Sequence, residues 1–163
     1  MSDVNPLVGV VMGSPSDKDV MQGCLEVLEE LKIPHEVRIL SAHRTPDETR
    51  EFALSASQRG LQVIIAGAGW AAHLAGFIAA HTLLPVIGIP IDSSPLKGLD
   101  SLLSTVQMPP GIPVATVAVG KGGAKNAAVL AAQILSLKHP GIAEHLRRYR
   151  RAITQAAMEK AKS

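Results

Sequence analysis

The feature that most constrains the fold of this chain is a regular alternation between short aliphatic runs and longer segments with helical spacing. The aliphatic runs, rich in Val and Ile, are 7–12, 36–40, 61–66, 85–91 and 112–120. Runs of this length and composition are typical of parallel strands that are buried on both faces of a sheet. The alternation therefore predicts an α/β protein with a doubly wound parallel sheet of about five strands.

Helix signals fill the segments between these runs. Ser14 or Ser16 is expected to open the first helix, whose apolar residues recur every three or four positions until Pro34 ends the run. Further helices are expected at 71–81, at 124–137 and, as an extra C-terminal helix, at 142–162. The stretch 93–111 is expected to be looser.

The second helix has the clearest start signal. Thr45 is predicted to be its N-cap, Pro46 stands at its first position, and Glu48 completes a capping box. Gly60 is expected to stop this helix.

Composition favours one domain, 1–163, with a core at about 8–137. The chain is 47% hydrophobic but only 2% aromatic, so the core is predicted to consist of Val, Ile, Leu and Ala. Its mean hydropathy of +0.22 is high for a small monomer and indicates further apolar surface buried between subunits. We therefore expect a homo-oligomer.

Several other classes of protein receive little support. The first residues lack a basic segment followed by an apolar one, and no uninterrupted apolar run is long enough to cross a membrane. We therefore expect a cytoplasmic protein with no membrane partner. The net charge is only +2, and the basic run 147–151 is interpreted as a solvated helix face, so no nucleic-acid partner is expected. Cys24 stands alone, which excludes a disulfide framework, and its spacing predicts a buried thiol.

Polar chemistry collects in the loops that follow the first three strands, where ligands of open parallel sheets bind. After the first strand, Gly13 allows close backbone approach. Ser14 and Ser16 present hydroxyls beside the N–H groups of a helix start, which favour a phosphate. Ordinary helix capping explains these serines equally well. Asp17 could cap the helix or accept hydrogen bonds from ribose hydroxyls.

After the second strand comes "SAHRTP", 41–46. Arg44 is suited to bind a phosphate through two hydrogen bonds. Histidine titrates near neutral pH, so His43 is a candidate proton carrier. The alternative for His43 is a loop histidine that hydrogen-bonds the backbone.

After the third strand comes "GAGWAAH", 67–73. Its small residues allow a backbone to approach a ligand, whereas Trp70 fills space. His73 could line a ligand pocket or donate to a backbone carbonyl. Only His43 and His73 lie in strand-end loops, with no carboxylate at metal-ligand spacing, so no catalytic metal is expected.

Six motifs occur in one order at compatible spacing: "VMGSPSD", "SAHRTP", "VIIAGAG", "AAHL", "GLDSLLSTVQMPPGIPVATVAVG" and "KNAAVLAAQIL". Together they resemble the class I PurE family, the bacterial N5-carboxyaminoimidazole ribonucleotide mutases of purine biosynthesis. The resemblance covers about 8–137. The sequences "SAHRTP" and "MPPGIPVAT" are more similar to the mutases than to the animal-type aminoimidazole ribonucleotide carboxylases.

This resemblance implies a flavodoxin-like three-layer fold, an octamer and an isomerase that moves a carboxylate from N5 to carbon 4 of aminoimidazole ribonucleotide. It implies no metal, ATP or biotin, with CO2 as a bound intermediate. His43 would be the general acid and base. The ribose phosphate would be held by Ser14, Asp17 and Arg44, with Ser41 at its border. The imidazole and CO2 would be surrounded by Gly67, Ala68, Gly69, His73 and Leu74. Ser16 is a further candidate substrate-binding residue, because its hydroxyl lies beside the N–H groups of the predicted helix start.

The sequence differs from the usual family sequence "GAGGAAHLPG" at two positions, where Trp70 replaces a glycine and Ala75 replaces a proline. Lys18 also stands where many relatives carry an aromatic residue. Trp70 would be strained if that glycine has a positive φ, and it either covers the pocket as a lid or blocks it. The alternatives to an active mutase are a direct aminoimidazole ribonucleotide carboxylase and a PurE-like protein that binds a sugar phosphate with little turnover.

Overall fold

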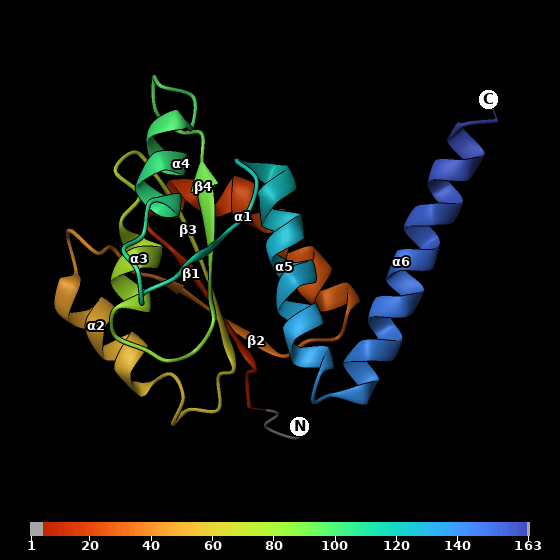
Figure 1. The fold of residues 1–163 in the computed structure, drawn as a ribbon, viewed down its shortest axis with the longest axis horizontal. Helices are drawn as coiled ribbons and strands as arrows, with labels where there is room; N and C mark the ends of the chain where they lie inside the picture. Colours follow the sequence, from red (N-terminus) through yellow and green to blue (C-terminus); the bar gives the residue numbers. More distant parts are fainter. Residues whose placement is uncertain (1–4, 163) are drawn as a thin grey trace.

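The computed structural model describes residues 5–162, which form one five-stranded parallel sheet covered by helices on both faces (Figure 1). The strands are β1 (Val8–Met12), β2 (His35–Ile39), β3 (Val63–Gly69), β4 (Val86–Ile91) and β5 (Ala115–Thr116). Their order in the sheet, β2-β1-β3-β4-β5, is that of flavodoxin-like folds. The predicted three-layer α/β architecture is confirmed. The expectation about a leader segment falls partly on residues 1–4, which lie outside the described range.

The helices form two layers, one on each face of the sheet (Figure 1). One layer contains α1 (Lys18–Glu30) and α5 (Lys121–Ser136), and the other contains α2 (Pro46–Ser55), α3 (Leu74–Ala79) and α4 (Leu99–Val106). Successive side chains of a strand point to opposite faces. Val10 of β1 therefore packs with α1 and α5, whereas its neighbour Val11 packs with α2 and α3.

The serine predicted to open the first helix caps a short turn before it, and the N-cap of α1 itself is Asp17, whose side chain makes no cap hydrogen bond. A short 3-10 turn, η1 (Pro15–Asp17), precedes α1, and Ser14 is its N-cap. Ser14 Oγ accepts hydrogen bonds from the Ser16 N–H at 3.3 Å and from the Ser16 hydroxyl at 2.9 Å. The buried face of α1 is formed by Met21, Cys24, Val27 and Leu28. The predicted burial of the lone thiol is therefore confirmed.

The capping box predicted for α2 is not formed. Thr45 is the N-cap, but its side chain makes no cap hydrogen bond. Instead, Thr45 Oγ1 accepts the Ser41 N–H at 2.9 Å and donates to the Ser41 carbonyl at 3.2 Å. The threonine thus closes the loop between β2 and α2. The helix itself ends at Ser55, and Gly60, at φ 94°, closes the turns that follow.

The stretch 93–111, expected to be looser, contains helix α4. Its N-cap is Gly98, at φ 88°, so no capping side chain marks its start. Leu99, Leu103 and Val106 are exposed on it. Together with Leu102 they follow the i, i+3, i+4, i+7 spacing of an amphipathic helix, a signal that could have revealed α4. The apolar face is turned outward, however, and Ser101 and Thr105 are buried instead.

The fifth strand is much shorter than the run 112–120 predicts. Only Ala115 and Thr116 pair with β4. Further along, the Gly120 N–H donates to the Pro90 carbonyl at 2.8 Å, but Pro90 has no N–H to donate in return. The regular ladder therefore ends after two residues.

The C-terminal helix α6 (Pro140–Lys160) leaves the body of the protein and diverges from α5 (Figure 1). Ile142, Leu146 and Tyr149 pack against the core, whereas residues 150–162 are exposed. The structure therefore contains the predicted extra C-terminal helix, and only its first half is packed.

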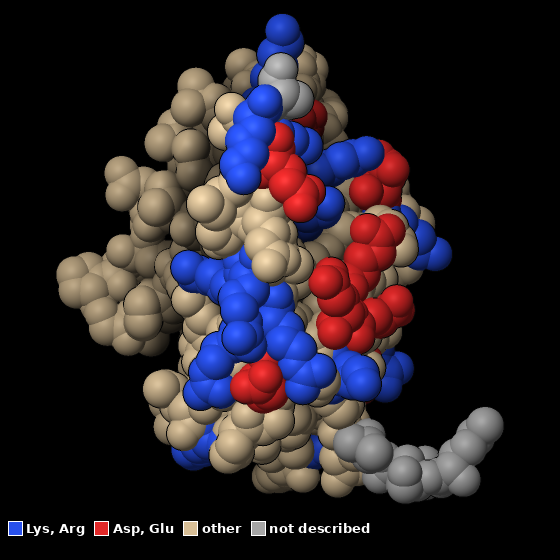
Figure 2. Space-filling view, turned by 90° about the vertical axis from the view of Figure 1, so that its right-hand side faces the viewer, with Lys and Arg blue, Asp and Glu red and all other residues tan. Residues whose placement is uncertain are grey.

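Basic side chains gather on the face of the molecule that α6 forms (Figure 2). Arg147, Arg148 and Arg151 all lie within ion-pair distance of Glu144. Part of the positive charge of this run is therefore compensated within the helix. Among the described helices, α6 included, none combines the length and the apolar character needed to cross a membrane.

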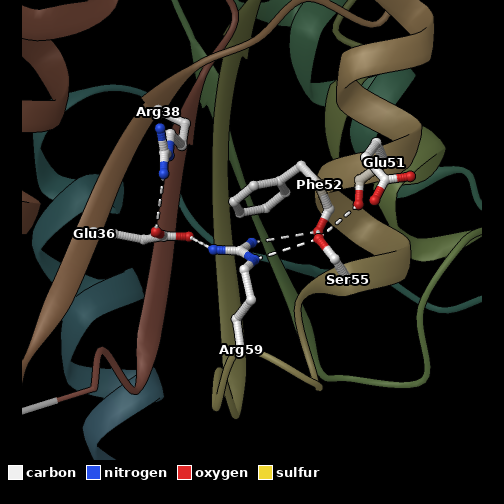
Figure 3. A network of polar contacts seen from close by, with 6 residues as sticks. All are labelled: Glu36, Arg38, Glu51, Phe52, Ser55 and Arg59. Atoms are coloured by element: carbon white, nitrogen blue, oxygen red, sulfur yellow. Dashed lines mark hydrogen bonds and ion pairs between the residues drawn. The ribbon is translucent and has the colours of Figure 1, made fainter.

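A polar network ties the edge strand β2 to α2 (Figure 3). Arg59 forms an ion pair with Glu36 of β2, and its Nε donates to Ser55 Oγ at 3.3 Å. The guanidinium also lies over the Phe52 ring, 4.8 Å from the centroid. The network therefore ties β2 to the C-terminal end of α2, the two elements that the loop 40–45 joins.

Candidate functional site

A cavity of about 580 Å³ opens at the carboxyl ends of β1, β2 and β3. This volume is within the range of small-molecule sites, roughly 300–1,000 Å³. The cavity is lined by every predicted site residue except Gly67, namely Ser14, Ser16, Asp17, Ser41, His43, Arg44, Ala68, Gly69, His73 and Leu74. Three loops that are distant in sequence meet here, because parallel strands end at one edge of the sheet.

Arg44 bridges the second loop to the first. Its Nη2 donates to the Gly13 carbonyl at 3.3 Å, and its backbone N–H donates to Ser41 Oγ at 3.2 Å. A guanidinium carries five N–H donors, so those not used by Gly13 remain for an anion in the cavity. The arrangement therefore suits a phosphate.

The serines of the first loop are placed so that capping does not exclude the anion-binding role that their sequence also allows. Ser14 caps η1, and Ser14 and Ser16 both line the cavity beside the helix start. Hydroxyls and N–H groups at a helix start favour an anion. The loop can therefore serve as cap and as anion cradle together.

Asp17 is a buried carboxylate, only 4% exposed, at the wall of the cavity. Burial raises the pKa of its carboxyl above the ordinary 3.8, while a hydrogen bond from the Ser14 N–H and the positive charge of Arg44 offset part of that rise. A carboxylate that has lost water is suited to accept hydrogen bonds from the hydroxyls of a ligand.

The two histidines of the strand-end loops contact each other. His43 Nε2 and His73 Nδ1 are 2.9 Å apart, so that one ring donates its N–H to the other. The rings meet edge to face, at 82°, with centroids 5.0 Å apart. Both side chains are exposed in the cavity wall. This ring-to-ring bond takes the place of the backbone hydrogen bonds that were the alternative for each histidine.

Glycines of the third loop allow neighbouring elements to approach closely. A Cβ on Gly69 would collide with Ser93 Oγ, and one on Gly67 would collide with Met21 Sδ. Gly67 therefore faces the core instead of the cavity. Its carbonyl accepts the Gly13 N–H at 3.0 Å. The structure thus gives Gly67 a supporting position under the first loop.

Trp70 adopts a left-handed conformation, with φ 55°. For a residue other than glycine, that conformation costs about 1–2 kcal/mol. The side chain lines the cavity and is 59% exposed. Because about 580 Å³ remains open beside it, Trp70 does not fill the cavity.

The other two residues that differ from the family sequence, Ala75 and Lys18, lie outside the cavity wall. Ala75 is buried in the core between α3 and the sheet, and Lys18 is exposed at the start of α1. Neither lines the cavity. Over residues 5–162, no three side chains of His, Cys, Asp or Glu are grouped to hold a metal ion.

Sequence reasoning missed Ala42, Ala71 and Ser93, which also line the cavity. Ser93 lies just beyond β4, so the rule that ligands bind at the carboxyl ends of strands could have found it. The two alanines carry no chemical signal that sequence alone could reveal.

Fold and cavity together define the class: a flavodoxin-like α/β protein with a candidate ligand site where β1, β2 and β3 end. The sequence model of the AIR carboxylase family matches residues 7–156. The chain belongs to this family.

Named relatives are similar over almost the whole chain. The N5-carboxyaminoimidazole ribonucleotide mutase of Pyrococcus horikoshii is 57% identical over 162 residues, which are 99% of this chain and 90% of the relative. The protein of the same name from Pseudomonas aeruginosa is 54% identical over 156 residues, 96% of each chain. The crystal structure of Treponema denticola PurE has a TM-score of 0.85 at 31% identity, covering 96% of this chain and 97% of that one. The resemblance to PurE proteins is therefore confirmed.

Proposed function

We propose that the chain is an N5-carboxyaminoimidazole ribonucleotide mutase, an isomerase that moves a carboxylate from N5 to carbon 4 of aminoimidazole ribonucleotide. Proteins of this name are 57% and 54% identical to it. The observation that carries the proposal is that one cavity combines groups suited to a phosphate with a hydrogen-bonded histidine pair. The reaction needs both an anchor for a ribonucleotide and a group that moves a proton.

The proton carrier is His43. The N5 carboxylate of the substrate is a carbamate, and protonation of N5 by His43 breaks the bond to the carboxyl carbon and frees CO2. The electron pair of carbon 4 then attacks CO2 and forms the new carbon–carbon bond. Loss of the proton from carbon 4 restores the aromatic ring, and His43 takes that proton back. One histidine thus serves as acid and then as base.

The first two loops anchor the ribose phosphate. Arg44 supplies guanidinium donors, and Ser14 and Ser16 supply hydroxyls beside the helix start. Asp17 accepts hydrogen bonds from ribose hydroxyls, and Ser41 borders the phosphate. Fixing the nucleotide in this way places its ring against the histidine pair.

The third loop holds CO2 between the two bond changes. Its cavity residues Ala68, Gly69 and Leu74 are small or apolar, and His73 completes the wall. A close, dry wall hinders escape of CO2 and the entry of water. This requirement accounts for the alanines of the loop, whereas Gly67 and Gly69 make room for Met21 and Ser93.

We propose in addition that the reaction uses no metal, ATP or biotin. The chain acts as a cytoplasmic homo-oligomer, an octamer, on a small-molecule ribonucleotide, without a nucleic-acid or membrane partner. Exposed apolar side chains support assembly: Val37 and Ile39 on the edge strand β2 are 42% and 43% exposed. Size-exclusion chromatography with light scattering tests the octamer, and assays with a chelator test the independence from metal.

The experiment that tests the activity offers two substrates and follows carboxyaminoimidazole ribonucleotide by its ultraviolet absorbance. The first substrate is N5-carboxyaminoimidazole ribonucleotide, and the second is aminoimidazole ribonucleotide with bicarbonate. A mutase converts the first at a rate that does not depend on added bicarbonate. Product from the second alone would identify a direct carboxylase. Tight binding with turnover of neither would identify a sugar-phosphate-binding protein.

A further inference from the structure

Trp70 is held in a conformation for which the fold provides no visible compensation. Its φ of 55° lies in the left-handed region, which strains a tryptophan but not a glycine. Strain of this kind persists where the surroundings hold it in place, yet Trp70 is 59% exposed and belongs to neither apolar cluster of the core. Such an outlier in a cavity wall points to a role in function.

The indole of Trp70 has no partner among residues 5–162. Its Nε1–H makes no hydrogen bond to them, and its ring meets no other ring or cation. Tryptophan combines a flat apolar face with one hydrogen-bond donor, which suits it to contact a planar ligand that is partly polar. The side chain is therefore available to whatever enters the cavity.

Trp70 belongs to the loop that carries part of the proposed chemistry. This loop runs from the end of β3 to α3, and it also contains His73, which is bonded to His43. The serines suited to a phosphate lie on a different loop, after β1. In a ribonucleotide anchored by its phosphate on that loop, the heterocycle is the part that reaches the histidines and Trp70.

We infer that Trp70 contacts the substrate by stacking its indole on the planar heterocycle of the bound ribonucleotide. In this position the indole covers the mouth of the cavity. The identity of that heterocycle rests on the proposed function. The cavity volume of about 580 Å³ beside Trp70 leaves room for the ligand. A ring stacked over the reacting carboxylate excludes water and hinders the loss of CO2. Trp70 is thus a lid made of one side chain.

Fluorescence tests this contact directly, because Trp70 is the only tryptophan of the chain. The probe is carboxyaminoimidazole ribonucleotide, with its Kd measured independently by calorimetry on the full chain. We expect the nucleotide to change Trp70 emission and to protect it from acrylamide, with half of the effect at the calorimetric Kd. Inorganic phosphate, which lacks the ring, is expected to leave the emission unchanged.

A control variant moves the indole away from the cavity. Trp70→Phe combined with Leu83→Trp places the only tryptophan at a fully exposed position that precedes β4, at the strand end opposite the cavity. Its emission is expected not to respond to the nucleotide. A response from this control at the same Kd would mean that the signal is not specific to a stacked ring, and the fluorescence support would be lost.

Three single variants measure the contribution of the ring. Trp70→Gly and Trp70→Asn suit the left-handed region but lack the stacking surface, so we expect nucleotide binding to weaken about tenfold. Trp70→Phe keeps a ring and is expected to retain most of the affinity. Trp70→Gly is also expected to release some CO2, with a proton left on carbon 4, so that aminoimidazole ribonucleotide forms beside the mutase product. A thermal unfolding midpoint at or above that of the wild type shows that Trp70→Gly is folded.

Each of four results would overturn the lid. The first is nucleotide binding by calorimetry without any change in Trp70 emission or acrylamide access. The second is a folded Trp70→Gly variant that binds and converts the nucleotide as the wild type does. Emission that depends on protein concentration but not on nucleotide also overturns it, because a second copy of the chain then covers the indole. Absence of nucleotide binding to wild type and variants alike refutes the proposed function and, with it, the lid.

Discussion

His43 Nε2 and His73 Nδ1 are 2.9 Å apart, although thirty positions separate the two residues in the sequence. The loop after β2 carries the first and the loop after β3 carries the second, while β1 lies between these strands in the sheet. The hydrogen bond holds the imidazole of His43 in one orientation. A proton carrier has to meet its substrate at hydrogen-bonding distance, so His73 is a positioning residue as well as part of the cavity wall.

Breaking this contact is expected to slow the reaction more than it weakens binding. His73→Phe keeps a planar ring but removes the hydrogen bond, whose net worth of about 0.5–1.5 kcal/mol corresponds to roughly a two- to tenfold loss in kcat. KM is expected to change little. His73→Asn restores a hydrogen-bonding atom near the position of Nδ1 and should recover part of kcat. Steady-state kinetics give the comparison, with His145→Phe on α6 as the control outside the cavity. A rise in KM with constant kcat would contradict the positioning role.

Arg44→Ala is expected to weaken binding of the nucleotide about tenfold to a hundredfold, because hydrogen bonds to a charged group contribute about 1.5–3 kcal/mol. Lysine lacks the planar fork of donors, so Arg44→Lys should recover only part of the loss. Calorimetric titration measures the effect. Arg50→Ala, an exposed arginine of α2 outside the cavity, is the control for charge. An unchanged Kd for Arg44→Ala would remove this residue from the phosphate site.

Asp17 predicts a pH dependence of stability with a definite sign. Burial raises the pKa of Asp17 above 3.8 in the folded chain. Between 3.8 and the raised pKa, the folded chain holds the proton that the unfolded chain has lost, so the free energy of unfolding falls as pH rises through that window. Asp17→Asn removes this cost and is expected to be more stable than wild type at pH 7.

The gain from Asp17→Asn is expected to shrink as pH falls towards 3.8, because the wild-type carboxyl then becomes neutral as well. Urea unfolding at several pH values measures it. Asp19→Asn, at an exposed neighbouring position, is the control. A gain of the same size at every pH would show that charge burial is not its cause. Ribonucleotide binding to Asp17→Asn is expected to be weaker, because an amide accepts fewer hydrogen bonds from ribose hydroxyls.

Cys24 is expected to be inert in the folded protein. Burial raises the pKa of its thiol to about 12, and the thiolate is the reactive form. A thiol reagent such as DTNB should therefore label the chain at pH 8 only after guanidinium unfolding, to one thiol per chain. Rapid labelling of the native protein would show that the α1 face opens readily.

The parallel sheet and the place of the site followed from local patterns in the sequence. Aliphatic runs such as "LVGVVM" specify buried strands, and the polar loops after three of them must meet at one edge of the sheet. The pairing of His43 with His73 could not be predicted in this way. It depends on the conformation of two loops, one of which is closed by the hydrogen bonds of Thr45 with Ser41.

The errors also have physical causes. Helix α4 begins at Gly98, whose positive φ leaves no capping signal in the sequence. Strand β5 is shortened by Pro90 of its neighbour β4, a tertiary effect that the run 112–120 does not contain. The resemblance groups Gly67 with the cavity residues, but Gly67 lies two residues before the end of β3, where a Cβ would meet Met21 in the core.

The central claim, that His43 carries the proton in a mutase site, is tested most directly by His43→Asn with carboxyaminoimidazole ribonucleotide. Calorimetry gives the Kd, and the loss of ultraviolet absorbance gives the turnover. We expect His43→Asn to bind within a few-fold of wild type but to turn over about 10²–10⁴-fold more slowly, as loss of a general acid and base implies. The control His145→Asn should behave as wild type. A His43→Asn variant with a turnover comparable to wild type would contradict the proton-carrier role.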